Sequence, residues 1–117
     1  MSGLTVANAS EWEAWLEANH EAASEVWLVY WKKGTGKATV AYDDAVEVAL
    51  KFGWIDGMVR TVDAERYEQR WTPRRPRSSW SETNKRTAER LIAAGAMRPR
   101  GLAAVEAARA SGRWAVP

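Results

Sequence analysis

Six consecutive bulky side chains constrain the fold of this chain more than any other feature. They are Val26, Trp27, Leu28, Val29, Tyr30 and Trp31, and most belong to the β-branched and aromatic types that strands favour. Because successive residues of a strand point to opposite faces, a strand over this run would be apolar on both sides. A strand of that kind needs cover on both faces. The run therefore predicts a central, covered strand over residues 25–33.

The same half of the chain predicts two helices. Ser10 and Glu13 match a capping box, in which a serine caps the helix and a glutamate three residues later reaches back. This first helix is expected to end near His20. Apolar residues recur at helical spacing over residues 42–52, and Gly53 is typical of a left-handed helix end. One helix is therefore expected before the central strand in the chain and one after it.

The second half of the chain predicts a hairpin and two more helices. Residues 55–71 have the pattern of two strands joined by a turn over residues 63–65. Ser79 or Ser81 is expected to cap a third helix. Pro99 suits the first turn of a fourth helix, because its missing N–H would have no partner there in any case.

These elements predict one α+β domain over residues 1–117. Their order is expected to give a small antiparallel sheet of about three strands, including one hairpin, packed against about four helices. The length of 117 residues and the apolar fraction of 46% are sufficient for a single core. In the last two helices we expect an exposed ion pair between Lys85 and Glu89 and an inward-facing Leu102.

The composition excludes several kinds of chemistry. The chain contains no cysteine, so disulfides, thiol catalysis and zinc–thiolate sites are excluded. His20 is the only histidine, and we expect it to contact the end of the first helix. The usual spacings of metal ligands do not occur in the sequence. We therefore expect no metal and no other cofactor.

The distribution of apolar residues also bears on location. Residues 1–8 lack the basic and apolar regions of a secretory signal. Apolar runs stay well below the ~20 residues that a membrane-spanning helix needs. We therefore expect a cytoplasmic protein with no membrane span.

Residues 53–84 carry the functional prediction, because indoles, arginines and one aspartate are crowded together there. Arginine is costly to bury without a partner. Arginine and tryptophan together suit a concave surface that binds a ligand by stacking and by forked hydrogen bonds. The side chains expected to line such a pocket are Tyr42, Trp54, Tyr67, Trp71 and Trp80, with Asp56, Arg70 and Arg74 as polar contacts and Asn84 at the mouth.

Two alternatives to this pocket stay open, and both concern the same stretch. The aromatic rings can form an ordinary core, and Asp56 with Gly57 can form a simple turn. Residues 66–90 also hold seven arginines and one lysine against three glutamates, although the whole chain has a net charge of only +2. Arg74, Arg75 and Arg77 therefore offer a surface for nucleic acid or another anionic partner, with nucleic acid disfavoured by the low net charge.

Several motifs in a fixed order resemble the bacterial YdeI/OmpD-associated family. They are Phe52-Gly53-Trp54-Ile55-Asp56-Gly57, Gln69-Arg70-Trp71-Thr72-Pro73-Arg74-Arg75, Ser78-Ser79-Trp80-Ser81 and Arg90-Leu91-Ile92-Ala93-Ala94-Gly95-Ala96-Met97. The resemblance extends from Glu11 to Ala108, with Trp71 where the family often has phenylalanine. It implies a role in protection against bacteriocins and cationic antimicrobial peptides, and members of the family are often described as periplasmic.

The favoured hypothesis is a small, non-catalytic binding protein. It would sequester or sense an antimicrobial peptide or a small aromatic or anionic antibiotic, so its partner would be a small molecule or peptide. One alternative is an enzyme that uses Asp56 as an acid or base. The other is a nucleic-acid or anionic-partner surface formed by the basic residues between Arg66 and Arg90.

Overall fold

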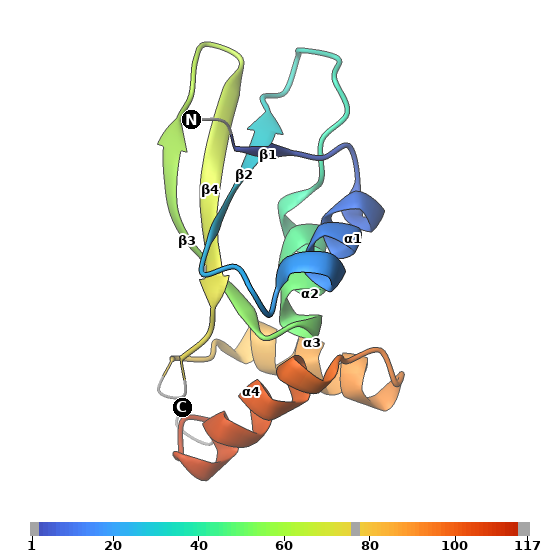
Figure 1. The fold of residues 1–117 in the computed structure, drawn as a ribbon, viewed down its shortest axis with the longest axis vertical. Coiled ribbons are helices and arrows are strands. Elements are labelled where there is room, and N and C mark those ends of the chain that lie inside the picture. The colour runs from blue at the N-terminus through green and yellow to red at the C-terminus, as the bar shows by residue number, and fades with distance from the viewer. Residues whose placement is uncertain (1–2, 76–77, 115–117) are drawn as a thin grey trace.

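The computed structural model describes residues 3–75 and 78–114, and Figure 1 shows the arrangement of its elements. In chain order these are β1 (Leu4–Thr5), α1 (Ala9–Asn19), β2 (Val26–Trp31), α2 (Tyr42–Lys51), β3 (Trp54–Thr61), β4 (Arg66–Pro73), α3 (Glu82–Ala93) and α4 (Pro99–Ala110). The α+β class and the four predicted helices are confirmed. In the described ranges, none of the helices is long and apolar enough to cross a bilayer.

The sheet has four strands in the order β1-β2-β4-β3, and it is mixed. β2 pairs antiparallel with β4, and β4 pairs antiparallel with β3 as the predicted hairpin. β1 adds a short parallel edge through Leu4 opposite Leu28 and Thr5 opposite Val29. We expected about three antiparallel strands, so the sequence prediction missed β1. Two residues are too few for strand alternation to be visible, and their pairing depends on β2.

One face of the sheet packs against α1 and α2 (Figure 1). The centre of this first core is Trp12, which is 0% exposed and whose ring centroid lies 5.6 Å from that of Trp71 in β4. The indole Nε1 of Trp12 donates to the backbone oxygen of Ala45 in α2 at 3.1 Å. Because a buried indole N–H needs an acceptor, this bond fixes α1 against α2.

A second core lies at the end of the sheet, where α2, α3 and α4 meet. It contains Leu50 from α2, Leu91 from α3 and Val105 from α4, with Trp80 at its edge. Figure 1 shows α3 and α4 next to the point where β4 ends and β3 begins. The helix α2 therefore belongs to both cores and connects the sheet to the C-terminal helices.

The other face of the sheet is covered by long cationic side chains. The guanidinium of Arg60 lies 3.7 Å from the ring centroid of Trp27, and the ammonium of Lys37 lies 4.2 Å from that of Trp31. Both indoles are half-buried. β2 is thus central and covered as predicted, but its second face is covered by cation–π stacking.

Details of the predicted helices need correction. The cap of α1 is Asn8, which accepts from the N–H of Glu11 at 3.0 Å, so the prediction of Ser10 with Glu13 was wrong by two residues. Asn8 and Glu11 have the same three-residue spacing as Ser10 and Glu13, two residues earlier in the chain. Glu13 instead pairs with Lys51 at 3.1 Å. His20 does bond the end of α1, through Nδ1 and the oxygen of Leu16 at 2.7 Å.

The surfaces of α3 and α4 also differ from the prediction. Ser81, one of the two serines proposed, caps α3. Lys85 is buried rather than exposed, and it pairs with Glu82 at 2.6 Å instead of with Glu89. Its Nζ also donates to the backbone oxygen of Trp114 at 2.8 Å, which holds the C-terminal turn against α3. Leu102 is 40% exposed and does not face inward.

Candidate functional site

A polar cleft with a volume of about 600 Å³ opens between α2, β3 and α3. Its lining consists of Tyr42, Asp43, Val46 and Glu47 from α2, Asp56 from β3, and Ser81, Thr83, Asn84 and Thr87 from the start of α3. This volume lies within the ~300–1,000 Å³ range of pockets for small ligands. Three of the predicted site residues, Tyr42, Asp56 and Asn84, meet in it.

Local structure places Asp56 at the floor of this cleft. It lies in β3 opposite Trp71 of β4, immediately before a β-bulge that extends to Val59. Trp71 points toward the helices, so the paired Asp56 points the same way. Asp56 and Gly57 are therefore part of a bulged strand, and they do not form a simple turn.

Two donors orient the Asp56 carboxylate. The hydroxyl of Tyr42, the first residue of α2, donates to Oδ2 at 2.8 Å, and Nε2 of Gln69 donates to the same oxygen at 3.3 Å. Neither the Tyr42 hydroxyl nor the Gln69 amide, the two donors seen in the described ranges, reaches Oδ1. One oxygen is therefore held in place and the other is left to accept from a ligand.

The amide of Gln69 is part of a hydrogen-bonded chain under the cleft. Its side chain is 4% exposed, and its Oε1 accepts from the Tyr30 hydroxyl at 3.0 Å. Burial raises the pKa of Tyr30 far above that of a free tyrosine, so this hydroxyl stays a donor. Sequence reasoning did not assign Gln69 to the site. The signal was available, because a glutamine that alternates with Tyr67 and Trp71 on a buried face needs polar partners.

The cleft is acidic and rich in hydroxyl groups. Asp43, Glu47 and Asp56 contribute carboxylates, and none of the residues that line it is basic. Arg90 on α3 reaches Glu47 from the rim, with Nη2 2.6 Å from Oε1, in an exposed ion pair of small energetic value. The arrangement therefore offers acceptors and negative charge, which suit an amine or another cation with hydroxyl groups.

The Tyr42–Asp56 bond predicts a measurable titration. Burial first, and then the hydrogen bond and the charge of Asp56, raise the pKa of Tyr42 to about 12. The folded pKa of Tyr42 exceeds the ~10 of an unfolded tyrosine. The protonated hydroxyl therefore contributes its full stabilisation below pH ~10, and this stabilisation is lost as the pH rises toward 12. In an absorbance titration of tyrosinate, Asp56→Asn is expected to move this transition to lower pH, and Tyr42→Phe is expected to remove it. An unchanged transition in Asp56→Asn would contradict the bond.

Three of the predicted aromatic residues lie elsewhere. Trp54 and Trp71 are 2% and 1% exposed and belong to the first core. Tyr67 stacks on Tyr30, with 5.0 Å between the ring centroids. These rings lie in the first core or pack against it, and they do not line the cleft.

The remaining predicted residues lie on two other surfaces. Arg70 is on the opposite face of the sheet, where it pairs with Glu25, because neighbours along a strand point to opposite sides. Trp80 is 8% exposed and lies beneath Arg74, whose guanidinium is 3.9 Å from its ring centroid. The expected set of indoles and arginines is thus divided among several places in the described chain, although Trp54 and Arg74 share one hollow. Arg77 lies outside the described residues.

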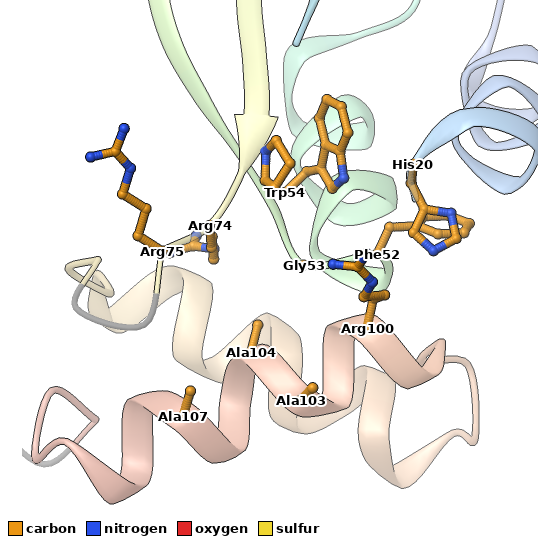
Figure 2. A pocket seen from close by; sticks show the side chains of 11 residues that line it. His20, Phe52, Gly53, Trp54, Arg74, Arg75, Arg100, Ala103, Ala104 and Ala107 are labelled. Atoms are coloured by element: carbon orange, nitrogen blue, oxygen red, sulfur yellow. The ribbon is translucent and has the colours of Figure 1, made fainter. Parts of the chain in front are cut away.

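Arg74 and Trp54 both line a second, smaller hollow, which we name the arginine groove. It has a volume of about 170 Å³ and lies between the start of β3, the end of β4 and α4 (Figure 2). Its lining residues are His20, Phe52, Gly53, Trp54, Pro73, Arg74, Arg75, Arg100, Ala103, Ala104 and Ala107. The groove and the polar cleft have no lining residue in common.

Comparison with known proteins assigns a family. No curated protein matches the chain, and no solved structure matches it. Residues 4–104 match the family described as "Domain of unknown function (DUF8412)". This match spans most of the chain, from β1 into α4, and includes every residue that lines the polar cleft. The chain therefore belongs to the DUF8412 family.

Proposed function

We propose that this protein is a non-catalytic binding protein, and that it takes a cationic, amine-bearing molecule in the polar cleft. The single observation that carries the proposal is the composition of the cleft. Three carboxylates and several hydroxyls line a hollow of about 600 Å³, and no basic residue is among the lining residues. Glu47 is paired with Arg90 outside this lining, so Asp43 and Asp56 are the carboxylates on which the proposal rests. An ammonium group in such a site would replace water by charge-assisted hydrogen bonds.

The orientation of Asp56 supports recognition of a specific donor. Oδ2 is held by Tyr42 and Gln69, so the position of the free Oδ1 is set before a ligand arrives. Such preorganisation increases affinity because less ordering is needed on binding. Asn84, at the N-terminal end of α3, adds an amide that can both donate and accept. Among the described residues, no three acidic or histidine side chains lie close enough together to hold a metal ion, so we expect an amine with neighbouring hydroxyls rather than a metal cation.

A cationic ligand changes one part of the sequence-based hypothesis. The indoles and arginines favoured an aromatic or anionic antibiotic, whereas the cleft favours a positively charged one. A cationic peptide or an amino sugar has the required groups, since both carry several amines. The resemblance to the YdeI/OmpD-associated family points the same way, because it implies protection against cationic antimicrobial peptides. We therefore propose sequestration or sensing of such a molecule.

The binding proposal predicts that spermidine, kanamycin or polymyxin B binds and that Asp56 matters for it. Titration calorimetry of the full chain at low salt is expected to show saturable binding of at least one probe. Asp56→Asn is expected to weaken it by about tenfold or more, because a charge-assisted bond contributes ~1.5–3 kcal/mol. Asp44→Asn is the matched control, since Asp44 lies in the first turn of α2 beside the lining residue Asp43, but is exposed and does not itself line the cleft.

The control separates a site from general acidic attraction. Equal weakening in Asp56→Asn and Asp44→Asn would contradict the proposal, and so would the lack of binding for all three probes at millimolar concentration. The enzyme alternative predicts that a bound probe is chemically changed, and that Asp56→Asn abolishes the change while retaining affinity. Mass spectrometry of the probe after incubation tests this alternative, and an unmodified probe supports binding alone.

A further inference from the structure

The arginine groove carries uncompensated positive charge. Arg74, Arg75 and Arg100 line it, no acidic residue does, and none of these three is ion-paired with a carboxylate of residues 3–75 or 78–114. Other arginines of the chain do hold carboxylates: Arg60, Arg66, Arg70, Arg90 and Arg98. Arg86, Arg109 and Arg113 also lack a carboxylate partner among the described residues, but they are exposed outside the groove. What distinguishes the groove is that three such arginines line one hollow, which points to an external anion.

Arg74 is the least exposed of these three arginines. One face of its guanidinium lies on Trp80, and Nη1 donates to the backbone oxygen of Ser79 at 3.1 Å. Its Nε is buried and has no acceptor in the described structure. Burial lowers the pKa of Arg74 to about 10, although the charge of Asp56 opposes this, and the group stays charged at neutral pH. A charge that is desolvated without a partner gains stability when an anion binds.

Arg100 provides a second guanidinium from the opposite wall. Figure 2 shows it extending from α4 toward Gly53 and Phe52, whereas Arg75 points away from the groove. The small residues Ala103, Ala104 and Ala107 form the α4 wall, so no side chain there fills the space. Arg74 is fixed by its backbone as well, since its N–H donates to the oxygen of Gly53 at 2.8 Å.

We propose that the arginine groove binds the phosphoryl group of inorganic phosphate or of a phosphate monoester between Arg74 and Arg100. Guanidinium groups match phosphate oxygens through forked hydrogen bonds, and two of them match its double charge. The volume of about 170 Å³ is below the ~300–1,000 Å³ of pockets for drug-sized ligands. The groove therefore suits one phosphoryl group with a small substituent, and this site is separate from the proposed amine cleft.

Titration calorimetry of the full chain with inorganic phosphate and with phenyl phosphate, in low-salt buffer, tests this proposal. Saturable binding is expected, and Arg100→Gln is expected to weaken it by about tenfold or more. Arg100 is exposed, so this variant is expected to fold, whereas Arg74→Gln removes a contact with Trp80 and needs a circular dichroism check. Arg86→Gln removes the same charge from an exposed position outside the groove and is expected to change affinity by less than about twofold.

The two probes distinguish the sources of the phosphoryl group. Tighter binding of phosphate supports the free ion, and tighter binding of phenyl phosphate supports a monoester. Lack of binding for both, or equal weakening in Arg100→Gln and Arg86→Gln, would overturn the proposal. Acetate that binds as tightly as phosphate would also overturn the proposal. Acetate carries a single charge, so equal affinity would mean that the groove binds anions in general and does not recognise a phosphoryl group. Neither Arg86 nor Arg100 lines the amine cleft, so these variants leave that cleft intact and the two proposals are tested separately.

Discussion

Replacing Trp12 by alanine is expected to lower the free energy of unfolding by about 3–5 kcal/mol, the largest loss that we expect from truncating a single side chain. Trp12 is 0% exposed, and its ring contacts Trp15 and Trp71 with centroid distances of 5.9 and 5.6 Å. Its removal also leaves the backbone oxygen of Ala45 without the indole donor. The loss therefore combines a cavity with a broken buried hydrogen bond.

Urea denaturation followed by far-ultraviolet circular dichroism measures this effect, because tryptophan fluorescence would itself change. Trp27→Ala is the control, since it removes the same side chain from the half-buried outer face of the sheet. There the loss is expected to be about 1–2 kcal/mol, from reduced stacking with Arg60. Similar losses in both variants would show that the core is not centred on Trp12.

Replacing Gly101 by alanine is expected to destabilise the protein by about 3 kcal/mol, although alanine favours helices by ~1 kcal/mol over glycine. A Cβ at this position would lie 2.2 Å from the backbone oxygen of Lys51 and 2.7 Å from its carbonyl carbon. That oxygen also accepts from the N–H of Arg98 at 3.0 Å. Two backbones meet at this point, so relief requires a shift of α4 away from α2.

Gly57→Ala is the matched control for this prediction. A Cβ there would lie 3.5 Å from its nearest neighbour, the backbone oxygen of Arg70, which is an ordinary contact. Its cost is therefore expected to stay within about 1 kcal/mol in the same denaturation experiment. If Gly101→Ala unfolds at the same urea concentration as the wild type, the close packing of α4 on α2 is contradicted.

The elements that local sequence specifies were predicted well. The hairpin, with its turn at residues 63–65, the helix α2 that ends before Gly53, and the start of α4 at Pro99 all carry their own signals of periodicity, turn chemistry or fixed dihedral angles. By contrast, β1 exists because β2 offers it an edge. Its two residues carry no signal that a sequence pattern could detect.

The candidate site was only partly predictable for a related reason. Tyr42 and Asp56 were named as site residues, but their hydrogen bond depends on a β-bulge and on how α2 packs over the sheet. Arg70 and Trp71 are neighbours in sequence, yet the strand sends them to opposite faces. Crowding along the chain therefore indicated the right region without indicating which side chains share a surface.

The most direct test of the amine-binding cleft is an NMR titration of the ¹⁵N-labelled chain with kanamycin at low salt. We predict saturable shifts, described by one dissociation constant, at the amides of Asp43, Asp56 and Asn84, which line the cleft from three different elements. The amide of Glu106, an exposed acidic residue on α4, is predicted to stay unchanged. Shifts that appear equally at Glu106, or that never saturate, would contradict the account.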